Sequence, residues 1–265
     1  MKKILCIILT VFLLTGSFVN MAAAYSPAVV GNQSGSRATK ILLIGNSYTY
    51  YNNFDDILKN VCEGAGKKVK ITMVTKGGAR LEEAADRHTK EGKEVYRLLK
   101  GQKWDYVVLQ DRHYFPLVRP GKIKKAVMTL KPLIEGAGAK MALFMTWAPG
   151  NGHDDYIRYS SVVSGRRQYQ AKIASAYEKI AREANAIVIP TGISFQNNVK
   201  QKTGIRLLRP DRSHPTYAGS YLSACTMFNT LLGTTSPTTY SGELNYSEAK
   251  TLRKIARQTV KQYKK

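Results

Sequence analysis

The amino-acid sequence predicts an α/β protein in which a parallel β-sheet lies between two layers of helices. Short apolar runs alternate along the chain with longer amphipathic stretches. Each run is mostly aliphatic and closes at Gly, Asn, Thr or Pro, which is typical of strands covered on both faces. This alternation favours right-handed crossovers and a three-layer α/β/α sandwich. We therefore expect the ligand site at the carboxyl ends of the strands.

Five apolar runs are the candidate strands, and the stretches between them are the candidate helices. The strands are expected at Lys40–Ile44, Val69–Val74, Tyr106–Gln110, Met141–Met145 and Ala186–Ile189. One apolar stripe covers residues 54–62 and ends at Gly64–Gly66, a second extends from Leu81 to Leu99, and a third from Ile173 to Ala181. Spacings of three and four residues within each stripe indicate α-helices.

The chain after Pro237 has its own pattern. Asn245-Tyr246-Ser247-Glu248 resembles a capping box. Beyond it, six residues share one apolar stripe: Leu252, Ile255, Ala256, Thr259, Val260 and Tyr263. Lys and Arg occupy the opposite face of this stretch. The pattern favours a final helix packed on the domain, with a helix lying on a membrane surface as the alternative.

Residues 1–24 are typical of a secretory signal peptide. Lysines at positions 2 and 3 precede an apolar run over residues 4–14, and alanines at 22–24 supply small side chains for cleavage. The run is shorter than the roughly 20 residues that span a bilayer. We expect cleavage near Ala24–Tyr25 and a secreted, extracellular or cell-wall-associated protein. A retained N-terminal anchor is the alternative.

The remaining chain is expected to form one domain. Residues 25–38 are rich in Ser, Gly and Asn and indicate a flexible lead-in. Residues 39–265 contain no internal repeat or linker and are long enough for one well-buried α/β domain. An exported protein could bridge Cys62 and Cys225, but their helix-like, apolar surroundings favour buried free thiols over a disulfide.

The formal net charge of +23 is large for 265 residues. It implies affinity for polyanions such as cell-wall polymers, acidic polysaccharide or anionic lipid. The basic residues are spread along the whole chain and are not gathered beside stacking aromatics, so a specific nucleic-acid partner is not supported. The net charge therefore indicates which polymers or surfaces the protein can bind, and it does not indicate which reaction the protein catalyses.

Ser47 is the candidate nucleophile. The run Ile41-Leu42-Leu43-Ile44 ends in Gly45-Asn46-Ser47, and a helix is expected within about eight residues. A serine at this place faces the cleft at the carboxyl edge of the sheet, where nearby backbone N–H groups can stabilise an oxyanion. An ordinary N-cap or turn serine is the alternative, so the motif needs partners.

The partners lie near the other end of the chain, in Arg209-Pro210-Asp211-Arg212-Ser213-His214-Pro215. A serine hydroxyl needs a base to remove its proton, and imidazole is the usual base near neutral pH. The imidazole in turn needs a carboxylate that fixes its tautomer. Asp211 and His214 are three residues apart in a segment bounded by two prolines. We expect them to be the orienting acid and the base for Ser47.

These segments resemble two sequence blocks of the SGNH (GDSL-like) hydrolases. Gly45-Asn46-Ser47 is similar to block I, and Asp211-x-x-His214 to block V, including the stretch that follows the histidine. The resemblance covers the chain from about Lys40 to about Gly233. It implies a flavodoxin-like sheet of five parallel strands in the order 2-1-3-4-5. No Gly-x-Ser-x-Gly occurs, which disfavours the α/β-hydrolase elbow.

The same resemblance implies an oxyanion hole. Block II supplies a glycine after the second strand, and of Gly77 and Gly78 we favour Gly78, beside the backbone N–H of Ser47. Block III, usually Gly-x-Asn-Asp, is replaced here by Leu109-Gln110-Asp111, which resembles a less-characterised branch of the family. The Gln110 amide is the expected substitute donor.

Four further residues are candidates for binding substrate: Gly77, Tyr48, Asp111 and Trp147. Tyr50 and Tyr51 also lie next to Ser47 and could line a sugar or acyl pocket, although many tyrosines only pack. His153-Asp154-Asp155 is expected to be a solvated loop and not a metal site. No metal or organic cofactor is implied.

The sequence therefore predicts a secreted serine esterase that hydrolyses carboxylic esters. O-acetyl groups on carbohydrate are the first expected substrate, because the resemblance includes exported carbohydrate deacetylases. A lipase or thioesterase of the same fold is one alternative. A non-catalytic surface protein that binds polyanions through its charge is the alternative from a different class.

Overall fold

The computed structural model describes residues 37–233 and 237–263. Its strands are β1 (Thr39–Gly45), β2 (Val69–Thr75), β3 (Tyr106–Leu109), β4 (Lys140–Phe144) and β5 (Ile187–Ile189). Each lies within one or two residues of a predicted strand, so all five predictions are confirmed. The predicted signal peptide and almost all of the predicted lead-in lie outside the described residues.

The strands form one parallel sheet in the order β2-β1-β3-β4-β5. The flavodoxin-like order that the family resemblance implied is therefore confirmed. Because all strands run the same way, the segments after their carboxyl ends share one edge of the sheet. Ser47, Gly78, Gln110 and Trp147 follow four different strands, so the sheet brings them to this edge.

The helices fill the connections between the strands and the C-terminal part of the chain. They are α1 (Ser47–Tyr50), α2 (Phe54–Glu63), α3 (Leu81–Ala85), α4 (Lys90–Gly101), α5 (Phe115–Val118), α6 (Pro120–Gly136), α7 (Asp155–Arg158), α8 (Arg166–Ala184), α9 (Thr191–Lys200), α10 (Tyr217–Leu231) and α11 (Tyr246–Tyr263).

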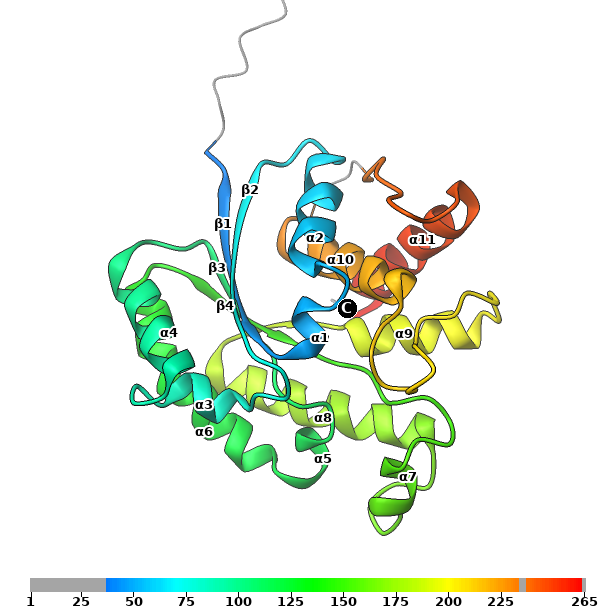
Figure 1. Cartoon of the computed structure of the whole chain (residues 1–265), viewed down its shortest axis with the longest axis horizontal. Coiled ribbons are helices and arrows are strands. Elements are labelled where there is room, and N and C mark those ends of the chain that lie inside the picture. Colours follow the sequence, from blue (N-terminus) through cyan, green and yellow to red (C-terminus); the bar gives the residue numbers. More distant parts are fainter. Residues whose placement is uncertain (1–36, 234–236, 264–265) are drawn as a thin grey trace, which may run out of the picture. The chain divides into compact units, whose positions relative to one another are not determined.

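Two hydrophobic cores lie on opposite faces of the sheet. One contains Leu42 and the buried faces of α3, α4, α6 and α8, and the other contains Leu43 and the buried faces of α2, α10 and α11. Figure 1 shows these two groups of helices on either side of the strands. Neighbouring strand residues point to opposite faces, so an unbroken aliphatic strand supplies both cores. The predicted three-layer sandwich is confirmed.

The end of the chain folds as a helix that packs on the domain. Asn245 Oδ1 accepts the backbone N–H of Glu248 at 2.9 Å, which satisfies one of the free donors at the start of α11. Leu252, Ile255 and Ala256 are 0% exposed in the core that α11 shares with α10. The apolar stripe is thus covered by protein, as the favoured prediction stated. Among the described residues, no helix has the length and apolarity needed to cross a membrane.

The expected continuous helix from Leu81 to Leu99 is wrong, because the chain turns between α3 and α4. Thr89 is the N-cap of α4, and its side chain accepts the Gly92 N–H at 2.9 Å. A Cβ at Gly92 would collide with the carbonyl oxygen of Asp86, so the turn requires glycine at this position. The spacing of apolar residues continues across the turn between α3 and α4, so the apolar pattern alone does not reveal the turn.

Cys62 and Cys225 are free, buried thiols on α2 and α10, as the sequence favoured. Burial raises the pKa of each thiol to about 12. Both cysteines therefore stay protonated near neutral pH and contribute to the core as small apolar side chains.

Candidate active site

Ser47 is the first residue of α1, just beyond the carboxyl end of β1. Asn46 is the N-cap residue, and its side-chain oxygen accepts the Tyr48 N–H at 3.2 Å. The Asn46 amide nitrogen donates to the Ala79 carbonyl oxygen at 3.1 Å and ties this turn to the loop after β2. The cap and this cross-link fix the backbone at Ser47, whose side chain is partly exposed.

The Ser47 hydroxyl lies beside an imidazole from the distant end of the sequence. Ser47 Oγ is 3.0 Å from His214 Nε2, and His214 Nδ1 is 2.8 Å from Asp211 Oδ2. The structure thus brings together the three residues that the sequence singled out, in one hydrogen-bonded chain. The side chains of His214 and Asp211 are 28% and 45% exposed, so this chain is accessible from solvent.

The loop that carries His214 is held by its own backbone. The Arg209 N–H donates to the His214 carbonyl oxygen at 2.9 Å, and Asp211 Oδ1 accepts the N–H groups of Ser213 and His214, both at 3.0 Å. Burial alone would raise the pKa of the Asp211 carboxyl, but these hydrogen bonds and the His214 side chain hold it below its usual value. An ionised Asp211 can therefore orient the imidazole and stabilise its charged form.

Aromatic rings support this loop from the protein interior. Tyr48 stacks on Trp147, with 4.7 Å between ring centroids. Trp147 Nε1 donates to the Ser213 carbonyl oxygen at 3.0 Å, and the Tyr48 hydroxyl is hydrogen-bonded to the Ser213 hydroxyl. Tyr48 and Trp147, predicted to bind substrate, are 5% and 0% exposed and hold the His214 loop.

Tyr51 is the neighbouring tyrosine that does reach the site. Its ring stacks on the His214 imidazole with 4.4 Å between centroids and 21° between planes. The Arg209 guanidinium lies 5.6 Å from the centre of the same ring, and the Tyr51 side chain is partly exposed. The tyrosine-rich run beside Ser47 pointed to such a contact, but only the fold decides which ring meets the imidazole.

The loop between β2 and α3 lies against the turn before Ser47. Gly78 has a φ of 62°, in the left-handed region that favours glycine. Across residues 37–233 and 237–263, the backbone N–H groups of Ser47 and Gly78 donate to no protein acceptor. Gly77 is also exposed, and a Cβ there would lie 3.2 Å from the Tyr50 hydroxyl. The free N–H groups of Ser47 and Gly78 are available to a substrate oxygen.

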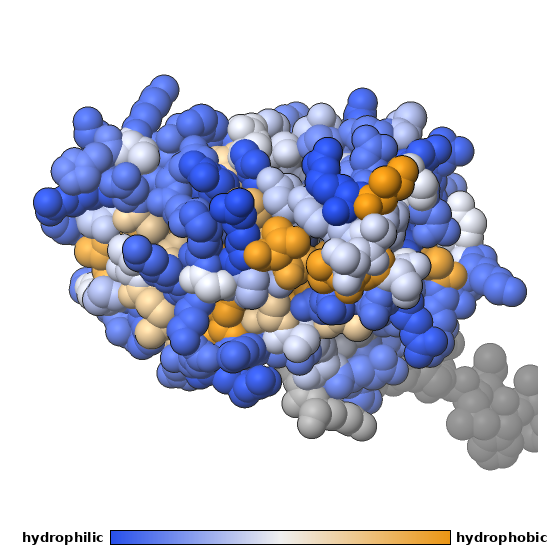
Figure 2. Space-filling view, turned by 90° about the horizontal axis from the view of Figure 1, so that it is seen from below, coloured by the Kyte–Doolittle hydropathy of each residue, from blue (hydrophilic) through white to orange (hydrophobic). Residues whose placement is uncertain are grey.

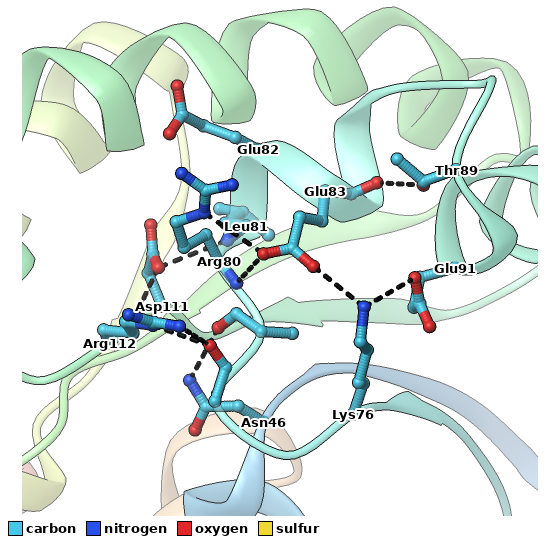
Figure 3. Close-up of polar contacts among 12 residues, drawn as sticks. Asn46, Lys76, Arg80, Leu81, Glu82, Glu83, Thr89, Glu91, Asp111 and Arg112 are labelled. Carbon is cyan, nitrogen blue, oxygen red and sulfur yellow. Dashed lines mark hydrogen bonds and ion pairs between the residues drawn. The ribbon is translucent and has the colours of Figure 1, made fainter.

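Arg112 and Asp111 hold this loop in place, together with Asn46 (Figure 3). The Arg112 guanidinium donates to the Gly78 carbonyl oxygen from Nε, at 2.6 Å, and from Nη2. Asp111 Oδ1 accepts the N–H groups of Leu81 and Arg112 at 3.2 and 2.7 Å. With its carbonyl held from one side, the peptide between Gly78 and Ala79 is fixed in direction, and this restrains the backbone of Gly78. No sequence motif marks Arg112, so its role could not be predicted.

Gln110 does not have the role that the sequence predicted. Its side chain is 1% exposed, and its Oε1 accepts from the Asn46 N–H and the Thr49 hydroxyl, both at 2.8 Å. Its Nε2 donates to the carbonyl oxygen of Asp111. Both ends of the amide thus form hydrogen bonds inside the protein, so Gln110 supports the turn before Ser47.

Asp111 is not a substrate-binding residue either, because it is 0% exposed. Within the described part of the chain, its Oδ2 has no hydrogen-bond partner. Burial raises the pKa of this carboxyl to about 6, although the N–H groups of Arg112 and Leu81 act in the opposite direction. A carboxylate at this place is therefore costly at neutral pH.

We expect Asp111→Asn to make the protein more stable than wild type at pH 8. The folded pKa of about 6 exceeds the usual 3.8, so the folded state binds the Asp111 proton more tightly than the unfolded state. The protonated Asp111 therefore adds on the order of 3 kcal/mol to the free energy of unfolding. This contribution is present in full below about pH 4 and is lost as the pH rises through about 6. Asparagine keeps the accepting oxygen without the charge.

Denaturant unfolding at pH 5 and pH 8 measures this effect. The unfolding free energy of Asp111→Asn should fall less between the two pH values than that of wild type. Asp56→Asn, at an exposed carboxyl on α2, is the matched control and should follow the wild-type profile. An equal fall in Asp111→Asn and wild type would contradict the assignment.

A second histidine–carboxylate pair lies beside the aromatic stack. His113 Nε2 is 2.8 Å from Asp155 Oδ2, which also accepts the Tyr169 hydroxyl at 2.8 Å, and the His113 ring stacks on Tyr48. Burial lowers the pKa of His113. Burial alone would raise the pKa of Asp155, but the hydrogen bonds from His113 and Tyr169 lower it. The pair is thus a neutral imidazole on a carboxylate and supports the stack. No sequence motif joins these distant positions.

The residues that the structure describes contain no group of three His, Cys, Asp or Glu side chains that could hold a metal ion. The segment His153-Asp154-Asp155 is more ordered than the solvated loop that was expected. Asp155 is buried and begins α7, and its N–H donates to His153 Nδ1 at 3.2 Å.

A Ser–His–Asp chain at the carboxyl edge of a parallel sheet is the arrangement of a serine hydrolase. Among solved structures, the chain is similar to a candidate SGNH hydrolase from Slackia heliotrinireducens, with 25% identity over 73% of this chain and 99% of that one, and a TM-score of 0.65. A DUF4886 family protein from Bacteroides uniformis shares the fold, with 22% identity, 86% and 97% coverage and a TM-score of 0.68.

An acetyl xylan esterase, AlAXEase, also shares the fold, with 16% identity over 72% of this chain and 98% of that one, and a TM-score of 0.53. No family model and no curated protein matches the sequence. The chain belongs to the SGNH/GDSL-like hydrolase superfamily, because it shares the fold and is similar to the Slackia heliotrinireducens protein.

Proposed function

We propose that this chain is an exported serine esterase in which Ser47 is the nucleophile, His214 the base and Asp211 the orienting acid. The observation that carries the proposal is the hydrogen-bonded chain from Ser47 Oγ through His214 to Asp211, with distances of 3.0 and 2.8 Å. A hydroxyl within reach of an imidazole, itself bonded to a carboxylate, is the geometry that makes serine a nucleophile.

The proposed reaction is acyl transfer to water. Ser47 Oγ attacks the ester carbonyl carbon and gives its proton to His214 Nε2, and the carbonyl oxygen becomes an oxyanion that accepts from the N–H groups of Ser47 and Gly78. When the carbon–oxygen bond to the alcohol breaks, His214 returns the proton to the leaving oxygen. A water molecule, deprotonated by His214, then releases the acid and restores Ser47.

The proposed substrates are short acyl esters on carbohydrate, with the acetyl group first. The triad lies at a solvent-accessible place, which suits esters displayed along a bulky glycan. Figure 2, which looks from the side on which α5 and α7 lie in Figure 1, shows a mostly hydrophilic face with limited apolar areas. An acetyl xylan esterase shares the fold, which supports this choice without identifying the sugar.

A panel of p-nitrophenyl esters and acetylated saccharides tests this proposal. We expect kcat/KM for p-nitrophenyl acetate to exceed that for the decanoate by about tenfold or more, because the proposed acyl subsite takes an acetyl group and would exclude a ten-carbon chain. Acetate release from acetylated xylan or another acetylated glycan should accompany it. Faster turnover of the decanoate would favour a lipase or thioesterase, and no turnover of any ester would favour a non-catalytic binding protein.

A further inference from the structure

A cavity lies between α8 and α9, on the same edge of the sheet as the candidate active site. Its volume is about 550 Å³. Three cationic side chains line it, from Arg166, Arg167 and Lys200, together with amide side chains such as Asn151 and Gln196. None of the described residues that line it carries a carboxylate. The composition is that of a site for a negatively charged, hydrogen-bonding ligand.

Arg166 is the most informative of these residues. Its guanidinium is partly buried, and burial lowers its pKa. Within residues 37–233 and 237–263 it forms no ion pair with an acidic side chain. A charge that is withdrawn from water is stabilised when an opposite charge meets it. Arg166 and Arg167 are also the first residues of α8, where the helix dipole is unfavourable for cations. A bound anion would offset both the burial of the Arg166 charge and this unfavourable dipole.

The wall of this cavity is shared with the candidate active site. Trp147 lines the cavity and also donates from Nε1 to the carbonyl oxygen of Ser213, the residue before His214 in the loop that carries the proposed base. On the same side, the Gly150 N–H donates to the Arg212 carbonyl oxygen at 2.7 Å. The cavity and the proposed nucleophile are therefore separated by one loop and one aromatic layer.

We propose that this cavity binds the carboxylate of an acidic sugar, so that the substrate class is an acetylated anionic glycan. The proposal rests on the proposed function for the substrate's role, but the binding itself does not depend on Ser47. Guanidinium groups pair with carboxylates through two parallel N–H donors, and amide side chains suit the neighbouring sugar hydroxyls. The net charge of +23 attracts such a polymer before it docks.

Calorimetric titration with trigalacturonate tests this site directly, with neutral xylotriose as the matched ligand. We expect trigalacturonate to bind the wild-type protein and xylotriose to bind at least about tenfold more weakly. In the double variant Arg166→Gln/Lys200→Gln, the Kd for trigalacturonate should rise about tenfold to a hundredfold. If that variant fails to fold, Arg166→Gln alone should still raise the Kd by about tenfold.

The control variant is Lys67→Gln/Lys68→Gln. It removes the same charge from two exposed lysines just before β2, at the opposite edge of the sheet, and should keep the wild-type Kd. An equal loss of affinity in both double variants, or equal binding of the neutral trisaccharide, would overturn the proposal. Sulfate at millimolar concentration should compete with trigalacturonate, and failure to compete would also overturn it.

Esterase turnover is measured separately, so the two proposals can fail independently. Binding of trigalacturonate at the cavity without turnover of any ester would refute the esterase and leave the anion site standing. Turnover of p-nitrophenyl acetate without the Arg166-dependent binding would refute the anion site alone.

Discussion

Ser47→Ala is expected to lower kcat for p-nitrophenyl acetate by about 10⁴-fold or more. In the proposed mechanism this hydroxyl forms the acyl intermediate, and it lies 3.0 Å from the imidazole that would accept its proton. Without it, only water activated by His214 can attack the ester. The substitution removes one partly exposed oxygen from the surface, so the folded structure should remain. Stopped-time assays of purified protein measure the loss.

A fluorophosphonate probe separates this effect from misfolding. The probe should label wild-type protein at Ser47, which mass spectrometry of the digested protein locates, and Ser47→Ala should remain unlabelled. Ser160→Ala, at an exposed serine in the turn after α7, is the control and should retain both labelling and turnover. Equal turnover by wild type and Ser47→Ala would exclude Ser47 as the nucleophile.

The sheet was predictable because its physical signal is local and strong. A strand covered on both faces must be aliphatic along its whole length, and the run from Ile41 to Ile44 is 0–1% exposed in the structure. The break between α3 and α4 was not predictable from the apolar spacing, since Leu81 and Leu99 face one core on both sides of it. Only the local chemistry of Thr89 and Gly92 marks the turn.

The site was predictable where a short motif determines the geometry. Asp211 and His214 lie on one tight loop, and Ser47 closes a strand, so the fold alone brings them to one edge. The residues around them were not predictable, because their roles depend on which atoms their side chains reach. The Gln110 amide is engaged with the turn before Ser47, whereas the guanidinium two residues later reaches the Gly78 carbonyl.

Which aromatic side chains are exposed and which are buried also depends on contacts that form only in the folded structure. Tyr48 lies in α1 and Tyr51, three residues later, is its C-cap, yet the first lies in the interior stack and the second on the imidazole. Helix periodicity over one turn does not decide this, because α1 has only four residues. Contacts with Trp147 and His214, from distant parts of the chain, determine the side chain directions.

Arg112→Ala is expected to lower kcat by about 10²- to 10³-fold while KM changes by less than about threefold. The guanidinium holds the Gly78 carbonyl and is itself placed by the Tyr114 hydroxyl, to which Nη1 donates at 2.9 Å. Without it, the peptide after Gly78 is free to rotate, the left-handed backbone of Gly78 loses its restraint, and the Gly78 N–H can leave the position proposed for it in the oxyanion hole. A hydrogen bond from this N–H stabilises the transition state more than the bound ester, so its loss should lower kcat and leave KM nearly unchanged.

Arg112→Lys distinguishes positioning of the peptide from a general loss of structure. A lysine ammonium can reach the Gly78 carbonyl with one donor where arginine uses two, so this variant should recover part of the lost rate. Arg182→Ala, at an exposed arginine on α8, removes the same charge away from the site and should keep the wild-type kcat. Unfolding midpoints of all three variants should lie close together, because Arg112 is only partly buried. A wild-type kcat in Arg112→Ala would mean that Asn46 and Asp111 suffice to hold the loop.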